Sequence, residues 1–177
     1  MVSRDSQQPL SPYRGDEMSD ETRQTAVAGS GQTPLVVRRG EPGDTSAIVE
    51  LIVSENNRPA DAAEIERYLA SAPSVVAFVD GELVGMIYSR RFSPDILEWR
   101  NSLVAAAHRR EGAGAQLVQA MEQQTRDAGY LAAIGVNCWK HAGTTRERAS
   151  SARAFWHAMG WTIIFATDGS AVVAKHF

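Results

Sequence analysis

Two arginines and two glycines stand together where an apolar segment gives way to an amphipathic one. Residues 103–107 are mostly apolar, a helix is predicted over 112–128, and between them lies the run Arg109-Arg110-Glu111-Gly112-Ala113-Gly114. The first N–H groups of a helix lack internal partners and carry a partial positive charge. Glycine lets an anion approach the backbone because it has no Cβ, and arginine adds charge-assisted hydrogen bonds to phosphate oxygens. The run therefore predicts an anion cradle suited to a pyrophosphate.

This run differs from two familiar phosphate-binding loops. It lacks the Gly-Lys-Ser/Thr ending of a P-loop and the third glycine of a dinucleotide-binding fingerprint. A glycine-rich turn with two surface arginines would also explain these six residues. Taken by itself, the run therefore leaves a binding interpretation and a purely structural one open.

Hydrophobic periodicity and turn residues predict the elements that must position this run. Asp80-Gly81 favours a tight hairpin, and Gly129 follows the last periodic residue of the long helix, as helix-ending glycines do. Strands are predicted over 35–38, 74–79, 82–89, 99–105, 131–136, 161–166 and 171–176. Helices are predicted over 45–53, 62–70, 112–128 and from Ser150 or Ser151 to Met159, with a polar loop over 138–148. The predicted order is therefore β-α-α-β-β-β-α-β-α-β-β.

Length and composition indicate one domain with an N-terminal tail. The chain has 177 residues, a formal net charge of −3 and one cysteine. Residues 1–33 are poor in large apolar side chains, which predicts a disordered tail ahead of a domain over 34–177. We find no basic stripe typical of nucleic-acid binding, no apolar run of the roughly 20 residues that span a bilayer, and no signal peptide. We expect a cytoplasmic protein, monomeric or homodimeric, that binds neither nucleic acid nor membrane.

A second segment, from Ala152 to Trp161, changes the interpretation of the first. It reads Ala-Arg-Ala-Phe-Trp-His-Ala-Met-Gly-Trp and resembles the Ala-x-x-Phe-Tyr-x-x-x-Gly-Phe helix of the GNAT superfamily of N-acetyltransferases. The run from Arg109 to Gly114 resembles the acetyl-CoA-binding motif of the same family, Arg/Gln-x-x-Gly-x-Gly/Ala. The resemblance covers about residues 35 to 177, and the order of the elements agrees. Two matches at the expected separation are far more specific than one.

The resemblance implies an α/β (α+β) fold and an activity. The fold is a mixed, largely antiparallel twisted sheet of six to seven strands, flanked by about four helices. Its two middle strands, here 99–105 and 131–136, splay apart. The implied activity is transfer of an acetyl group from acetyl-CoA to a primary amine of a small molecule, amino acid or peptide N-terminus. No metal is implied.

The resemblance also assigns residues to the cofactor. Main-chain groups on the open strand would bind pantetheine, and main-chain N–H groups of the run would bind the pyrophosphate. An amide near Ser102 would polarise the thioester carbonyl as an oxyanion donor. Ser150 or Ser151 would replace the asparagine that many relatives carry at the position of Ala149. The residues predicted to contact CoA are Leu103, Val104, Arg109, Arg110, Glu111, Gly112, Ala113, Gly114, Ala115, Ser150 and Phe155.

Glu98 is the leading candidate for a general base, because some members of the family place a glutamate at the start of this strand. Alternation with a period of two would put Glu98, Arg100, Ser102 and Val104 on one face. A solvated carboxylate at the end of a strand is the alternative interpretation. Glu55 and Asp61 are possible substrate-binding carboxylates, for which simple loop charge is the alternative.

Trp156 stands where many relatives carry a tyrosine that protonates the leaving thiolate, and indole is not a useful acid. Water is one substitute, because a thiol has a pKa near 8.5. The other candidates are His157, Tyr130, Tyr88 and Cys138. This departure supports a second hypothesis, a CoA-binding regulatory module without turnover, and a third is a protein of this fold that binds no CoA. Cys138 and His141 are too few for a structural zinc site, which needs four ligands.

Overall fold

The structure is a computed structural model that describes residues 34–138 and 146–177. The predicted tail over residues 1–33 lies outside the described residues. So do residues 139–145, which include His141 and most of the loop predicted over 138–148. The elements of the described part follow the predicted order, with two short 3₁₀ turns added.

The strands are β1 (Val36–Arg39), β2 (Ser74–Val79), β3 (Glu82–Arg91), β4 (Ile96–Val104), β5 (Ala132–Cys138), β6 (Thr162–Ala166) and β7 (Ser170–His176). The helices are α1 (Thr45–Asn56), α2 (Ala62–Ser71), α3 (Ala113–Asp127) and α4 (Arg146–Ala158), and the 3₁₀ turns are η1 (Pro42–Asp44) and η2 (Ala106–His108).

Two elements begin several residues before their predicted starts. The strand β4 begins at Ile96 rather than Trp99, because the N–H groups of Phe92 and Ser93 both donate to the Ile96 carbonyl, at 3.0 and 3.1 Å, and close a tight hairpin loop. The helix α4 begins at Arg146, upstream of the serines that were predicted to open it. Ser150 therefore lies within α4 and is exposed.

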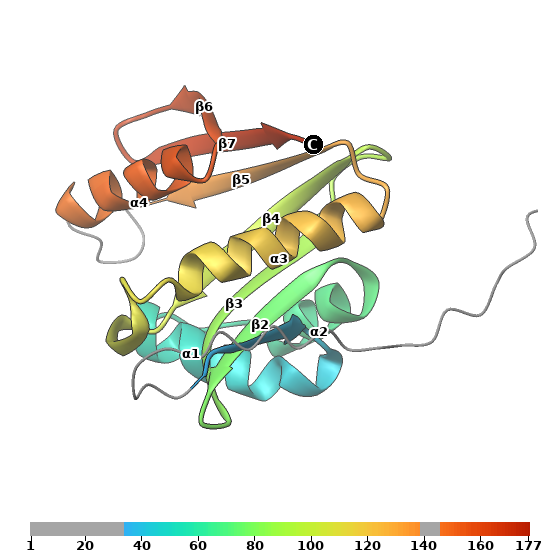
Figure 1. Cartoon of the computed structure of the whole chain (residues 1–177), viewed down its shortest axis with the longest axis vertical. Helices are drawn as coiled ribbons and strands as arrows, with labels where there is room; N and C mark the ends of the chain where they lie inside the picture. Colours follow the sequence, from blue (N-terminus) through green and yellow to red (C-terminus); the bar gives the residue numbers. More distant parts are fainter. Residues whose placement is uncertain (1–33, 139–145) are drawn as a thin grey trace, which may run out of the picture.

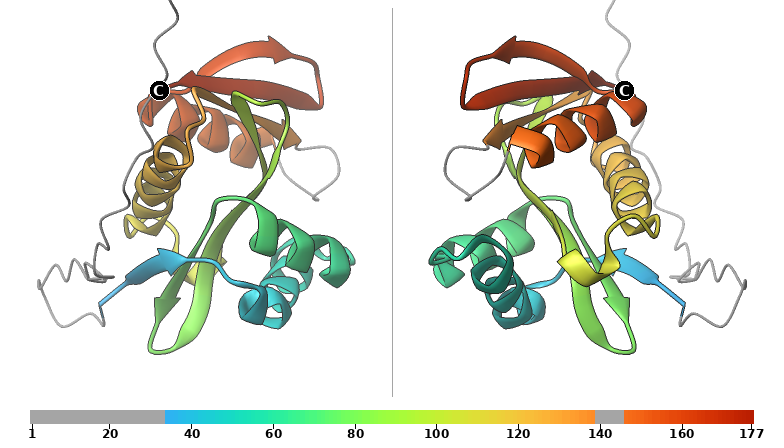
Figure 2. Two further views of the ribbon diagram at one scale, coloured as in Figure 1. Left: turned by 90° about the vertical axis from the view of Figure 1, so that its right-hand side faces the viewer. Right: turned by 90° about the vertical axis from the view of Figure 1, so that its left-hand side faces the viewer.

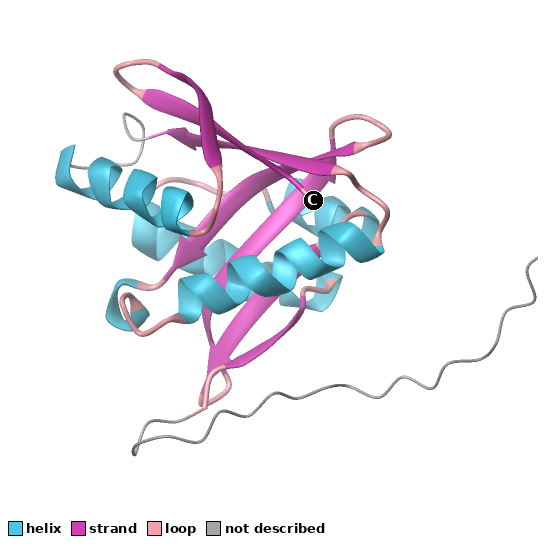
Figure 3. Cartoon of the chain, turned by 45° about the horizontal axis from the view of Figure 1, so that its top comes forward, coloured by secondary structure: helices cyan, strands magenta, loops and turns pink. Residues whose placement is uncertain are grey.

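The described strands form one seven-stranded sheet in the order β1-β2-β3-β4-β5-β7-β6. Neighbouring strands are antiparallel except for β4 and β5, which run parallel. Helices α1 and α2 cover one face of the sheet and α3 covers the other (Figures 1 and 2). Figure 3 shows helices on both sides of the twisted sheet. The predicted fold class is confirmed.

Each face of the sheet has its own buried cluster. On the face of α3, the core contains Ile87, Leu97, Trp99, Leu117, Val118, Met121 and Trp161. On the face of α1 and α2, the core contains Ile48, Ile52, Ile65, Leu69, Val76, Met86 and Tyr88. Burial of apolar side chains at this scale is the main term that holds such layers together.

The pairing of β4 with β5 stops halfway along both strands. Ile96–Trp99 pair with Ala132–Gly135, and the register ends there. Beyond this point β4 pairs only with β3, and β5 pairs only with β7. Figure 1 shows the two strands close together near the C-terminus and diverging toward the end where α4 lies. The predicted splay of the two middle strands is confirmed.

A β-bulge marks the point where the strands part. Tyr88 of β3 is opposite Asn101 and Ser89 is opposite Trp99, so Arg100 is an extra residue in β4. A bulge bends its strand and increases the local twist. The bend at Arg100 therefore turns the end of β4 away from β5 immediately after their last paired residues.

Candidate active site

The end of β4 presents main-chain groups to the space between the splayed strands. The Ala105 N–H donates to the Val84 carbonyl at 2.8 Å, so Ala105 directs its main chain toward β3. Main-chain directions alternate along a strand. Ser102 and Val104 therefore direct their N–H and C=O groups to the open side, whereas Leu103 directs its own toward β3. The main chain of Leu103 therefore does not face the open side, whereas that of Ser102 does; Leu103 still lines the cavity, and its contact with CoA stays a prediction.

The bulge also separates residues that alternation would place together. Glu98 is opposite Arg90 on the face of α1 and α2. After the extra residue Arg100, the side chains of Ser102 and Val104 line a cavity on the opposite face, beside α3. The prediction that Glu98 shares a face with Ser102 and Val104 is therefore wrong, because period-two alternation does not survive a bulge.

A cavity of about 180 Å³ lies between the open end of β4, α3 and α4. Gly114 faces Phe155 closely enough that a Cβ would lie 3.5 Å from the ring. A Cβ at this position would make an ordinary van der Waals contact, so the helix end lies directly beside the aromatic wall. The cavity is lined by Met86, Ile87, Ser102, Leu103, Val104, Gly114, Leu117, Val118, Ala152, Phe155 and Trp156.

The N-terminus of α3 adjoins this cavity and offers main-chain donors. Gly112, the residue before the helix, has a φ of 89°, and Arg110 has a φ of 70°. The Gln116 N–H donates to the Gly112 carbonyl at 3.1 Å and makes the first bond of the helix. The N–H groups of Ala113, Gly114 and Ala115 precede that bond and point out of the helix end. A Cβ built on Gly112 would meet no atom within 4 Å, so the approach to these donors is open.

Arg109 and Arg110 differ in their surroundings, although the sequence suggests the same role for both. Arg110 is exposed. Arg109 forms an ion pair with Glu55 of α1 and donates from Nε to the Val104 carbonyl at 2.8 Å. Glu111 is exposed, with its carboxylate 3.6 Å from the His108 imidazole. The structure thus commits Arg109 to protein partners and leaves Arg110 at the surface.

The two carboxylates predicted for substrate both have local structural partners. Glu55 accepts from the Ala106 N–H at 2.8 Å and pairs with Arg109. Asp61 accepts from the Glu64 N–H at 3.0 Å and caps the N-terminus of α2. Simple loop charge describes neither residue. A cap such as Asp61 is readable from sequence, but the contacts of Glu55 are not, because they join distant parts of the chain.

Glu98 is buried and held by two arginines. Arg90 Nε lies 2.6 Å from one carboxylate oxygen and an Arg100 terminal nitrogen lies 2.9 Å from the other. Burial opposes the charge, but the hydrogen bonds and charges of the two arginines outweigh it and lower the pKa of Glu98 below its ordinary value. A carboxylate stabilised in its charged form is a weak proton acceptor. This geometry argues against the predicted role of Glu98 as a base.

The predicted proton donors are scattered. Trp156 lines the cavity, where the family resemblance would place a tyrosine, and its ring packs on Phe155 and Trp161 with centroids 5.4 and 5.1 Å apart. Tyr130 follows the far end of α3, a 15-residue helix that spans about 22 Å. Tyr88 belongs to the core on the other face, where burial raises its pKa. Neither tyrosine is therefore suitably placed as the acid, and the indole of Trp156 is not a useful acid.

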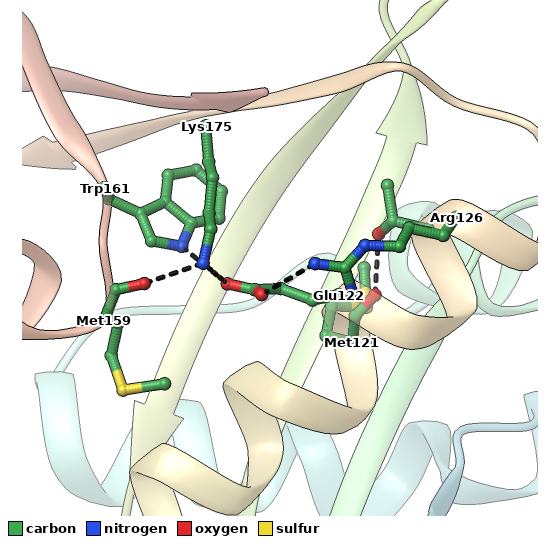
Figure 4. A network of polar contacts seen from close by, with 7 residues as sticks. Met121, Glu122, Arg126, Met159, Trp161 and Lys175 are labelled. Atoms are coloured by element: carbon green, nitrogen blue, oxygen red, sulfur yellow. Dashed lines mark hydrogen bonds and ion pairs between the residues drawn. The ribbon is translucent and has the colours of Figure 1, made fainter. Parts of the chain in front are cut away.

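A buried carboxylate that the sequence did not reveal joins α3 to the C-terminal strands. Glu122 is 6% exposed and accepts from the Trp161 indole at 3.1 Å and from Lys175 Nζ at 2.7 Å (Figure 4). Lys175 also donates to the Met159 carbonyl at 2.8 Å, and Arg126 approaches the second carboxylate oxygen of Glu122 at 3.4 Å. Helical periodicity places Glu122 outside, so only these long-range partners could reveal its role.

The described residues were also searched for metal-binding groups and for membrane-spanning helices. Within 34–138 and 146–177, no group of three or more His, Cys, Asp or Glu side chains is arranged to hold a metal ion. In the same part of the chain, no helix is both long and apolar enough to cross a membrane.

The sequence matches the model of the acetyltransferase (GNAT) family over residues 45–161. This match spans more than half of the chain, and the open strand edge, cavity and helix end described above lie within it. The chain therefore belongs to the acetyltransferase (GNAT) family. Among curated proteins, no sequence matches it.

Several solved structures share the fold of this chain. Ard1 from Thermoplasma volcanium is 18% identical, with a TM-score of 0.65 over 80% of this chain and 97% of its own. The PaiA N-acetyltransferase from Thermoplasma acidophilum, in complex with coenzyme A, is 12% identical, with a TM-score of 0.65 over 81% and 99%. Diaminobutyrate acetyltransferase EctA from Paenibacillus lautus, in complex with L-2,4-diaminobutyric acid and coenzyme A, is 18% identical, with a TM-score of 0.61 over 81% and 95%.

Proposed function

We propose that this protein transfers an acetyl group from acetyl-CoA to a primary amine by direct attack of the amine on the thioester. One observation carries the proposal: the edge of β4 at Ser102 and Val104, which has no strand partner on the side of β5, opens on the same cavity as the N-terminus of α3. An extended amide chain ending in a pyrophosphate needs these two kinds of partner side by side. Pantetheine would pair with the strand edge, and the helix end would receive the pyrophosphate.

The donors of the pyrophosphate site would be the N–H groups from Arg110 to Ala115, with Arg110 adding charge. Phe155, which lies directly beside Gly114, would form the apolar wall along the pantetheine arm. Ser150 is exposed and does not line the cavity, so it contributes to CoA binding less than the sequence predicts.

In the chemical step, the amine nitrogen attacks the thioester carbonyl carbon, a C–N bond forms, and the carbonyl electron pair moves onto oxygen. The Ser102 N–H, which faces the gap, would donate to that oxygen. One such donor contributes about 3 kcal/mol to the transition state. The carbonyl re-forms as the C–S bond breaks, and the sulfur leaves as the CoA thiolate.

Two protons must then move. The attacking nitrogen releases one, and we propose water as its first acceptor, because two arginines hold Glu98 in its charged form and lower its pKa. The thiolate takes up the other. A thiol pKa near 8.5 lets water supply this proton, so the indole of Trp156 need not act as an acid.

A turnover assay tests the proposal. The protein is incubated with acetyl-CoA and a panel of amino acids, diamines, aminoglycosides and peptides, and released CoA is measured with a thiol reagent. We expect CoA release that depends on one class of amine. Calorimetry with CoA is run in parallel, so that failure to turn over is distinguished from failure to bind.

A CoA-binding module without turnover is the second candidate, and Trp156 in place of the tyrosine favours it. This candidate predicts CoA binding with no thiol release from any amine. The variant Trp156→Tyr separates the two: a module that lost only its acid gains turnover, whereas an enzyme that relies on water changes its rate by no more than about tenfold.

A further inference from the structure

Glu55, in the last turn of α1, reaches the segment that joins β4 to α3. One of its carboxylate oxygens accepts from the Ala106 N–H at 2.8 Å, and the other pairs with the Arg109 guanidinium. Arg109 in turn donates from Nε to the Val104 carbonyl at 2.8 Å. These two side chains link the helix on one face of the sheet to the open strand end on which the proposed CoA site is built.

The contacts fix successive peptide groups of this segment. The peptide between Val104 and Ala105 is held on one side by Val84, which accepts from its N–H, and on the other by Arg109, which donates to its carbonyl. The next N–H, that of Ala106, is held by Glu55. The His108 N–H closes the turn by donating to the Ala105 carbonyl at 2.9 Å. These protein contacts therefore hold the main chain from Val104 to His108.

The charge of Glu55 makes the pair necessary. Its side chain is 16% exposed, so water screens it weakly, and a carboxylate against this segment opposes an incoming phosphate. The Arg109 guanidinium, paired directly with the Glu55 carboxylate, neutralises this negative charge. The Nε and one terminal nitrogen of Arg109 are engaged by these two protein partners, which fix where the guanidinium lies.

We propose that Glu55 and Arg109 are positioning residues for CoA binding. Glu55 holds the segment after β4, and Arg109 fixes the Val104 carbonyl and neutralises Glu55 instead of contacting a phosphate. The exposed Arg110 is the arginine of the run that meets the pyrophosphate. This inference rests on the proposed function, because it concerns how the chain binds CoA.

Calorimetric titration with CoA tests the pair through a double-mutant cycle. Arg109→Gln alone leaves the Glu55 charge uncompensated, and we expect CoA affinity to fall about 30-fold, the effect of losing a charged hydrogen bond of about 2 kcal/mol. The double variant Glu55→Gln/Arg109→Gln removes both charges. We expect its affinity to lie within about threefold of that of Glu55→Gln alone, because the two effects are not additive.

The salt dependence of CoA affinity supplies a signature that a merely structural role would not give. Arg110→Gln, the matched control, loses a phosphate contact, so its affinity varies less with ionic strength than that of the wild type. The double variant has the same local net charge as the wild type, so we expect the salt dependence of its CoA affinity to match that of the wild type. Arg109→Lys retains the charge without the fork of donors and serves if a glutamine variant fails to fold. We expect its affinity between those of wild type and Arg109→Gln.

Three outcomes decide the matter. Recovery of affinity in the double variant supports the pair. A double variant as weak as Arg109→Gln shows that neutralising Glu55 is not the role of Arg109, and one whose salt dependence flattens as in Arg110→Gln shows that Arg109 is a phosphate ligand. Either result overturns the inference while the proposed function stands. If the wild type binds no CoA, the proposed function fails and the inference fails with it.

Discussion

The two ends of the β4–β5 pair are built in opposite ways. At the closed end, Ile96–Trp99 pair with Ala132–Gly135, and the buried carboxylate of Glu122 ties α3 to Trp161 and Lys175 (Figure 4). At the open end, β4 and β5 no longer pair with each other. There the Glu55 carboxylate of α1 holds the end of β4 through Arg109. One end is closed by main-chain pairing, and the other is kept open by side chains.

This difference shows how a sheet can hold a binding edge without unravelling. An unpaired strand edge exposes main-chain groups that must find other partners. The bulge at Arg100 creates such an edge in the middle of the sheet. The Glu55–Arg109 ion pair holds α1 to the segment after β4, and the Glu122–Lys175 ion pair holds α3 to β7. The closed end should therefore govern stability, and the open end should govern CoA binding.

The largest expected effect is on the stability of the closed end. Glu122→Ala leaves Lys175 and the Trp161 indole without their acceptor, and we expect the free energy of unfolding to fall by about 3 kcal/mol. Urea denaturation measures this loss. The control Glu122→Met/Lys175→Met removes both charges and should recover most of the stability. Equal losses in both variants would contradict a role based on charge pairing.

The second largest effect is expected on CoA binding at the open end, and it is tested with the two glycines that flank α3. Gly112 precedes α3 with a φ of 89°, and Gly129 follows it with a φ of 81°. In both cases a Cβ would meet no atom within 4 Å. Leucine at either site therefore carries a similar backbone strain of about 1–2 kcal/mol, but only Gly112→Leu blocks the proposed phosphate cradle.

We expect Gly112→Leu to weaken CoA binding at least 100-fold, or about 2.7 kcal/mol, and Gly129→Leu to leave it within about threefold of wild type. Calorimetry with CoA measures both affinities, and thermal melts compare their stabilities. Similar CoA affinities in the two variants would show that α3 does not hold the pyrophosphate at its N-terminus.

A smaller effect is expected at Glu98, on the closed side of the bulge. Because its two arginine partners lower its pKa, Glu98→Gln should reduce kcat/KM less than about tenfold and leave the shape of the pH–rate profile unchanged. Turnover across a pH series measures this. A loss above 100-fold together with the disappearance of a basic limb would establish Glu98 as the general base after all.

The smallest expected effect is on stability in acid. A carboxylate with a lowered pKa stabilises the fold above the pKa of the unfolded chain, and that contribution is lost as the pH falls through the lower folded value. For Glu98 the loss begins below the ordinary value of 4.5. Urea midpoints of wild type and Glu98→Gln should therefore converge as the pH falls below about 4.5. Midpoints that stay equally far apart down to the acid limit would show that Glu98 is not stabilised in its charged form.

The sequence revealed those parts of the site that depend on neighbours along the chain. A helix N-terminus with glycines in front of it is a local feature, so the run from Arg109 to Gly114 pointed to the correct strand–helix junction. Period-two alternation failed at Glu98, because a bulge at Arg100 follows from how β3 and β4 pair and leaves no signal in the residue types. Beyond the same bulge, the main chain of Ser102 and Val104 faces the open side.

What the sequence determined by itself was the order of the elements, the family and the strand–helix junction at which we propose the phosphate cradle, because periodicity, turn residues and helix ends act over a few residues. Only the tertiary structure decided which partners the charged groups near that junction have. Arg109 meets Glu55 across 54 residues, and Glu122 meets Trp161 and Lys175 across 39 and 53. Such partners are chosen by the packing of whole elements, so two neighbouring arginines of the same type, Arg109 and Arg110, acquire different surroundings.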